Sequence, residues 1–170
     1  MKYIIFYFFS IFILSFSFVN AQSSKKINKD TKAWRYEIEV VQTGVDGTYL
    51  IKVWSYSKKP VNANEQAKKN AIHGIIFKGF SGSGQIAGQK PLTNNSNLEI
   101  EKAEFFNDFF QNGGKYSKFI NLVGDGSIAS GDIIKVDKEY KIGVVVSVNV
   151  FALRKDLEDA GIIKSLNSGF

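Results

Sequence analysis

The most regular stretch of the chain is Tyr140-Lys141-Ile142-Gly143-Val144-Val145-Val146-Ser147-Val148, followed at once by Asn149. Tyr140 and every second residue after it are apolar, which is the period of a strand with one buried face. Asn149 is a residue type that caps the amino terminus of helices, so a helix is expected to follow directly. Its inner stripe is then Val150, Leu153, Leu157 and Ala160, and Gly161 ends it.

Four more strands are predicted before this one. Residues 34–40 alternate apolar and charged side chains, and 43–47 supply a glycine-containing hairpin turn. Residues 48–57 are apolar on both faces, which is typical of a strand in the centre of a sheet. Shorter strands are expected at 119–123 and 133–136, each followed by a tight turn or link.

Two further helices are predicted between these strands. Asn62 and Glu65 have the spacing of a capping box, and Glu65 with Lys69 is expected to form an outward-facing pair. The inner stripe of this helix is Ala67, Ala71 and Ile75, flanked by Ile72 and Ile76. A second helix with an aromatic face is expected from Phe105, Phe106, Phe109 and Phe110, ended by Gly113-Gly114.

These elements predict an α+β fold: an antiparallel sheet of about four to five strands, with two to three helices packed on it. The 170 residues suit one domain, placed at 34–170, with a Gly/Ser/Asn-rich loop at 81–97. A loop of that length is expected to be either mobile or functional.

The amino terminus predicts export. Lys2 precedes an apolar run at 3–19 and the triplet Val19-Asn20-Ala21, so 1–21 is interpreted as a signal peptide cleaved before Gln22. The alternative is an uncleaved membrane anchor. Gln22 after the cut resembles exported proteins of Bacteroidota, which implies the periplasm or outer envelope. Residues 22–33 are lysine-rich and predict a flexible leader arm, with no membrane span after cleavage.

The composition excludes several kinds of chemistry. There is no cysteine, so disulfides, thiolate metal sites and a lipid-bearing cysteine are excluded. The net charge of +6, or +5 once Lys2 is removed, is too dispersed to predict nucleic-acid binding. The aspartates at 125, 132 and 137 suit turns better than a calcium site. We therefore expect no metal and no cofactor.

Two groups of side chains are candidates for function. Trp54 and Tyr56 share the second face of the strand at 48–57 with Lys52, a combination that suits a protein partner or a glycan if it is exposed. The alternative is that the helix around residues 105–110 covers them. His73, the single histidine, is interpreted as a surface or core-edge residue rather than a catalytic base.

Two stretches carry a family resemblance: Glu65-Gln66-Ala67-Lys68-Lys69-Asn70-Ala71, and residues 140–148 running into Ala152-Leu153-Arg154-Lys155-Asp156-Leu157. Across 34–157 the chain resembles the small envelope domain shared by the amino-terminal part of flagellar-assembly T proteins and by certain bacterial surface lipoproteins. The resemblance implies a non-enzymatic interaction or assembly module with an envelope protein partner. The alternatives are a periplasmic binder of a glycan or small ligand, and a hydrolase.

Overall fold

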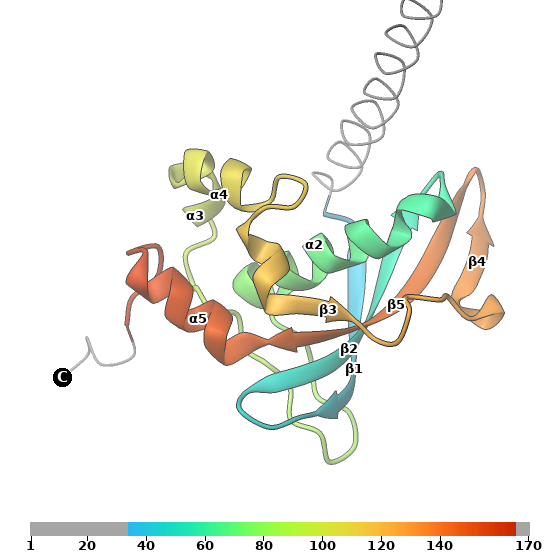
Figure 1. Ribbon diagram of the computed structural model, residues 1–170, viewed down its shortest axis with the longest axis horizontal. Helices are drawn as coiled ribbons and strands as arrows, with labels where there is room; N and C mark the ends of the chain where they lie inside the picture. Colours follow the sequence, from blue (N-terminus) through green and yellow to red (C-terminus); the bar gives the residue numbers. More distant parts are fainter. Residues whose placement is uncertain (1–33, 166–170) are drawn as a thin grey trace, which may run out of the picture.

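The computed structural model describes residues 34–165, which form a curled antiparallel sheet with helices on one side (Figure 1). The strands are β1 (Tyr36–Thr43), β2 (Thr48–Ser57), β3 (Ile120–Leu122), β4 (Ile133–Val136) and β5 (Glu139–Asn149). The helices are α2 (Ala63–Phe77), α3 (Leu98–Glu101), α4 (Ala103–Phe109) and α5 (Val150–Asp159), with 3-10 turns at Pro60–Asn62, Lys115–Phe119 and Ser130–Asp132. The predicted α+β class is therefore confirmed. The predicted signal peptide (1–21) and leader arm (22–33) lie outside the described residues.

β2 and β5 form the middle of the sheet. Its order is β1-β2-β5-β3, and β4 pairs with the first residues of β5 while β3 pairs with its last. Ile51 lies opposite Val146 and Val53 opposite Val144 in an antiparallel register, and all four side chains are buried. The alternation that predicted these two strands therefore marks the face that carries the core.

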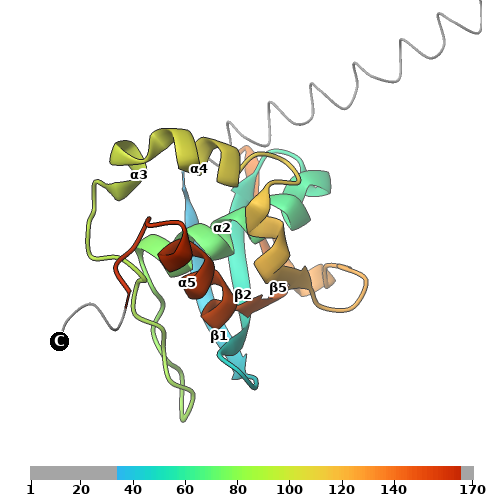
Figure 2. The ribbon, with the colours of Figure 1, turned by 60° about the vertical axis from the view of Figure 1, so that its left-hand side comes forward.

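The helices cover this apolar face. α2 packs against β2 and β5, and Figure 2 shows α2 and α5 in front of the strands. Ala67 and Ala71 are fully buried there, because side chains this small let a helix lie close to a sheet. Gly74 allows the same close approach over β1, since a Cβ at this position would meet Tyr36 Cε2 at 3.1 Å and Ile38 Cδ1.

The junction between β5 and α5 agrees with the prediction. The Asn149 side chain accepts a hydrogen bond from the Ala152 amide at 2.8 Å, which satisfies one of the unpaired donors of the first turn. Gly161 follows the helix with φ +66°, a left-handed conformation that favours glycine. Leu153 and Leu157 are buried as expected, but Ala160 is exposed and does not belong to the inner stripe.

The predicted capping box at the start of α2 is wrong. The Asn62 side chain makes no capping hydrogen bond, because Pro60–Asn62 forms a 3-10 turn that continues into the helix. Glu65 instead accepts a hydrogen bond from the Tyr116 hydroxyl and pairs with Lys68 at 2.6 Å. The outward placement of Lys69 is also wrong, since this side chain is fully buried.

The predicted aromatic helix is present as two short helices. α3 ends at Glu101, α4 begins at Ala103, and α4 ends at Phe109, before the glycine pair. Three of its aromatic side chains, Phe106, Phe109 and Phe110, are buried on the helix side of the sheet. Phe106 packs edge-on against Phe77 of α2, with ring centroids 5.2 Å apart. This helix therefore adds to the core above α2.

The segment between α2 and α3 is organised by backbone hydrogen bonds. Phe80 pairs with Gln89, and Ser83 pairs with Ile86, in isolated antiparallel bridges. Residues 91–97 then return to the last turn of α2, where the Leu92 amide donates to the Ile75 carbonyl at 3.1 Å. The glycine-rich stretch thus forms a small hairpin, and the asparagine-rich stretch lies against a helix end.

Candidate functional site

The three predicted binding residues lie together on the sheet face opposite the core. Lys52, Trp54 and Tyr56 of β2 are half-buried, and their antiparallel neighbours on β5 include Gly143 and Lys141. We call these five residues the open face. None of the helices α2–α5 lies over this face in the described part of the chain (Figure 2). The alternative that the helix around 105–110 covers Trp54 and Tyr56 is therefore wrong, because that helix packs on α2.

The indole of Trp54 lies flat on the backbone of Gly143. A Cβ at Gly143 would meet three ring carbons of Trp54 at 3.0–3.1 Å, so the missing side chain creates the place where the ring rests. The Lys52 and Lys141 ammonium groups each lie 5.5 Å from the indole centroid, within cation–π range. Trp54 Nε1 has no hydrogen-bond partner among the described residues. The open face thus presents an aromatic ring held by a glycine and two cations.

Ion pairs surround this ring. Lys52 Nζ lies 2.8 Å from Asp132 Oδ1, and Lys141 Nζ lies 2.7 Å from Glu37 Oε2. The Glu37 hydrogen bond raises the pKa of Lys141 above its ordinary value. Each open-face lysine is therefore a cation with a carboxylate beside it, so the face is polar at its edge and nearly balanced in charge.

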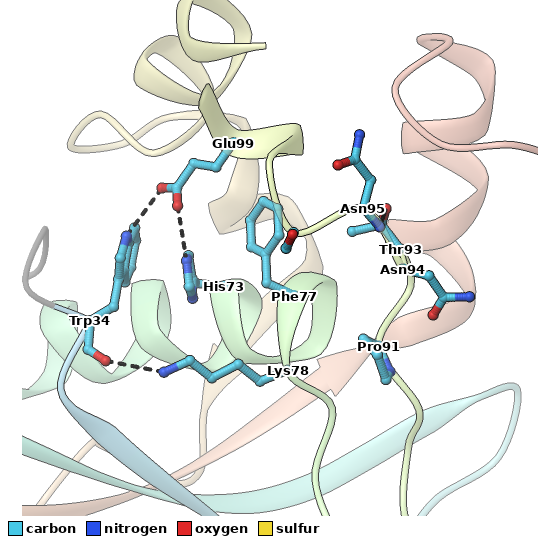
Figure 3. A pocket seen from close by; sticks show the side chains of 10 residues that line it. Trp34, His73, Phe77, Lys78, Pro91, Thr93, Asn94, Asn95 and Glu99 are labelled. Carbon is cyan, nitrogen blue, oxygen red and sulfur yellow. Dashed lines mark hydrogen bonds and ion pairs between the residues drawn. The ribbon is translucent and has the colours of Figure 1, made fainter. Parts of the chain in front are cut away.

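A second constellation lies on the helix side, and its centre is His73. His73 Nδ1 lies 2.7 Å from the Tyr36 hydroxyl, and His73 Nε2 lies 3.3 Å from Glu99 Oε2. The Trp34 indole stacks on the imidazole with centroids 3.6 Å apart, and Trp34 Nε1 donates to Glu99 Oε1 at 3.1 Å (Figure 3). We call Trp34, Tyr36, His73 and Glu99 the His73 network. It joins the amino-terminal strand to α2 and α3.

The partners of the His73 imidazole assign its tautomer. A carboxylate accepts hydrogen bonds and donates none, so His73 Nε2–H donates a hydrogen bond to Glu99. His73 Nδ1 then accepts a hydrogen bond from the Tyr36 hydroxyl. Burial lowers the pKa of His73, although Glu99 opposes the shift, and burial followed by the Glu99 charge raises the pKa of Tyr36. Both groups are therefore neutral near pH 7. Both ring nitrogens of His73 are therefore engaged within the network.

A pocket of about 460 Å³ opens beside this network. We call it the α2–α3 pocket. Its walls come from the His73 network, the end of α2 and the loop before α3. The lining residues are Trp34, His73, Phe77, Lys78, Pro91, Thr93, Asn94, Asn95, Ser96 and Glu99. In Figure 3 the rings of Trp34, His73 and Phe77 lie in a row between Glu99 and Lys78. His73 was predicted at the surface or at the core edge; the surface position is wrong, since the side chain is only 4% exposed, and it lies where the core meets the pocket.

Sequence analysis did not find this pocket. The side chains of the His73 network lie 26 to 65 residues apart where they hydrogen-bond, so no local spacing connects them. The one local signal is that His73 and Phe77 are four residues apart and therefore share a face of α2. Trp34 was placed in strand alternation with Tyr36, but its φ of +44° turns it out of the strand, which begins at Tyr36.

Within residues 34–165, no group of three His, Asp or Glu side chains is placed to hold a metal ion. The helices of this same region are too short or too polar to cross a membrane. Comparison of the chain with protein-family models, curated proteins and solved structures finds no match. The geometry of the two sites is therefore the basis for proposing a function.

Proposed function

We propose that the protein is an exported, non-enzymatic envelope component that acts as an interaction or assembly module through its open face. The observation that carries this proposal is the flat Trp54 ring on a helix-free sheet face. A large aromatic ring that rests on backbone and stays half-buried in the free protein can bury further area in a complex at little entropic cost.

The surroundings of Trp54 support a protein partner. Trp, Tyr and Arg are the residue types most enriched where binding energy concentrates in interfaces. Trp54 and Tyr56 are neighbours on β2, and the Arg35 guanidinium lies 5.2 Å from the Tyr56 ring centroid. The ion pairs of Lys52 and Lys141 provide a polar rim around an aromatic centre, which is the usual anatomy of such an interface.

Other features support the envelope location and the non-enzymatic role that we propose. The signal-peptide pattern supports a partner in the periplasm or outer envelope, in agreement with the resemblance to the small envelope domain. The engagement of both nitrogens of His73 supports a contact function, because a general base needs a nitrogen that can reach a substrate.

Trp54→Ala tests the proposal in a deletion strain that is complemented with variants of the gene. The variant is expected to lose complementation at normal protein level. Because the ring also packs on Gly143, the melting temperature is measured as well, and complementation is compared at a temperature at which both this variant and its control are folded. Phe151→Ala is the matched control, because Phe151 is an aromatic side chain that is 64% exposed away from the open face. Full rescue by Trp54→Ala, or equal loss with both variants, would contradict the proposal.

A further inference from the structure

The α2–α3 pocket has features of a ligand site that the proposed docking function does not use. Its volume of about 460 Å³ lies within the range of small-molecule sites, roughly 300–1,000 Å³. Phe77 and Pro91 provide apolar wall, whereas Asn94, Ser96 and Glu99 provide polar groups. A concave surface of this mixed composition is typical of sites that hold a ligand by stacking and by a few directed hydrogen bonds.

The loop that forms one wall is held in place before any ligand arrives. The Thr93 amide donates to the Ile76 carbonyl at 3.2 Å, so the loop uses acceptors that the end of α2 would otherwise expose. The Asn95 amide donates to Thr93 Oγ1 at 3.1 Å, and the Asn97 amide donates to Asn95 Oδ1 at 2.9 Å. This fixed backbone lowers the ordering cost of binding.

Glu99 is a second pocket residue whose side chain is held in place by hydrogen bonds. Its two carboxylate oxygens accept from Trp34 Nε1 and His73 Nε2, which sets the plane of the group. The side chain is 35% exposed, so the carboxylate can be reached from the pocket, and an ionised carboxylate accepts hydrogen bonds but donates none. Glu99 therefore favours a ligand that brings hydrogen-bond donors and disfavours an anionic one.

Lys78 sets the charge of the pocket. Its Nζ donates to the Trp34 carbonyl at 3.2 Å (Figure 3). The same Nζ lies 4.2 Å from the Tyr36 ring centroid, so the ammonium contacts two members of the network and its charge balances that of Glu99. Because burial keeps His73 neutral, the formal charges of the lining sum to zero. A cationic ligand would face Lys78 and an anionic ligand would face Glu99, so a neutral ligand fits best.

The remaining polar groups call for a ligand with hydroxyls. Asn94 and Ser96 are exposed, and their side chains have no hydrogen-bond partner in the described part of the chain. An amide and a hydroxyl can each donate and accept, which matches hydroxyl groups. We propose that the α2–α3 pocket binds a neutral saccharide unit, with its hydroxyls on Glu99, Asn94 and Ser96 and its C–H face against Phe77.

The two tryptophans of the chain allow a direct test, because each belongs to a different site. In a ¹⁵N-labelled mature protein, the indole N–H signal of Trp34 reports the α2–α3 pocket and that of Trp54 reports the open face; Trp54→Phe assigns them. Glucose, N-acetylglucosamine and their β-linked disaccharides are the probes. At least one is expected to shift the Trp34 signal in a saturable way, with a Kd on the order of 1 mM, and to leave the Trp54 signal in place.

Variants then locate the contact. Asn94→Ala and Ser96→Ala are each expected to weaken binding about three- to tenfold, the loss of one hydrogen bond. Asn107→Ala is the matched control, because Asn107 is an exposed amide on α4 outside the pocket, and it is expected to bind as the wild type does. Trp54→Ala should also retain binding, which separates this inference from the proposed docking function.

Three results would overturn the inference. These are the absence of a saturable shift with every probe, a shift confined to the Trp54 signal, and unchanged affinity in both Asn94→Ala and Ser96→Ala. The second result would move saccharide binding to the open face. Asn94, Ser96 and Asn107 are exposed side chains, and the fold of every variant can be checked from the rest of the same spectrum.

Discussion

At the scale of single residues, α2 carries two buried ionisable side chains one turn apart, Lys69 and His73. Burial disfavours the charged form of each and therefore lowers both pKa values. Each side chain is held by a polar partner from a distant segment. Lys69 Nζ donates to Asn112 Oδ1 at 2.7 Å, and His73 bonds Tyr36 and Glu99. Both contribute to stability in a way that depends on pH.

Lys69 should make stability rise at alkaline pH. Burial lowers its pKa from 10.5 to about 8, so between these values the unfolded chain binds a proton that the folded chain has lost. The free energy of unfolding of the wild type should therefore rise from pH 8 to 10.5, relative to Lys69→Met, by up to about 3 kcal/mol. Urea denaturation of both proteins across this pH range measures the difference.

The control for Lys69 is Lys118→Met, the same change at an exposed position. This variant should follow the wild type across the whole pH range. A difference in free energy of unfolding between the wild type and Lys69→Met that stays constant with pH would mean that burial does not lower the pKa of Lys69.

His73 should make the protein less stable at acid pH. Its pKa in the folded protein lies below the ordinary 6.5, so as the pH falls through 6.5 the unfolded chain takes up a proton before the folded chain does. The free energy of unfolding should decrease there, with a slope of at most about 1.4 kcal/mol per pH unit. Because the chain has one histidine, the proton NMR signal of the imidazole gives its titration midpoint without assignment.

The midpoint is expected below 6.5 in the folded protein and near 6.5 in urea. A midpoint at or above 6.5 in the folded protein would refute the burial argument and would make Glu99 the dominant influence on the imidazole.

The residue scale is also where sequence reasoning failed most. Lys69 was placed outside because lysine is seldom buried and because Glu65 stands four residues before it. Its partner Asn112 lies 43 residues away, and a hydrogen bond over that separation leaves no local pattern. The His73 network could not be predicted for the same reason, since its hydrogen bonds also join residues far apart in the sequence. By contrast, Lys52, Trp54 and Tyr56 were grouped correctly on one face, because alternation along a single strand is a local property.

At the scale of elements, the contact of α2 with the sheet depends on small side chains. Ala67 and Ala71 are fully buried against β2 and β5. Ala71→Arg should therefore lower the free energy of unfolding by several kcal/mol, about 3–5, because the new side chain overfills the contact and buries a charge without a partner. Ala103→Arg is the matched control at an exposed helical alanine and should be within about 0.5 kcal/mol of the wild type.

Thermal and urea unfolding of the two variants measure this difference in stability. Equal stability of Ala71→Arg and Ala103→Arg would show that α2 does not pack closely on the sheet.

The elements that were predicted well are those whose signal is periodic. β4 and β5 follow the expected ranges within one residue at each end, and the Asn149 cap is where the sequence placed it. The elements that were predicted poorly begin or end without such a signal. The break between α3 and α4 falls at Lys102, a good helix former, so local propensity gives no sign of it.

At the scale of the whole molecule, the sheet separates two surfaces. The open face lies on one side of the sheet, and the α2–α3 pocket lies on the helix side beside α2 (Figures 2 and 3). A protein partner on Trp54 would leave the pocket open, so the two proposed binding events can occur together. Variants of one site should leave the other unchanged, which is why the two tryptophans are useful reporters.

Export is the prediction that concerns the whole chain. Lys2, the apolar run at 3–19 and the compact residues at 19–21 match the three parts of a signal peptide, and a peptidase that cuts after Ala21 leaves Gln22 as the first residue. Intact-mass measurement of the protein released by osmotic shock should therefore give a chain that begins at Gln22. Ala21→Arg should block cleavage, since the peptidase reads a small residue at that position, and should keep the protein with the membrane. If the wild type retained Met1 in a membrane-embedded product, the apolar run would be an anchor and the open face would act beside the membrane.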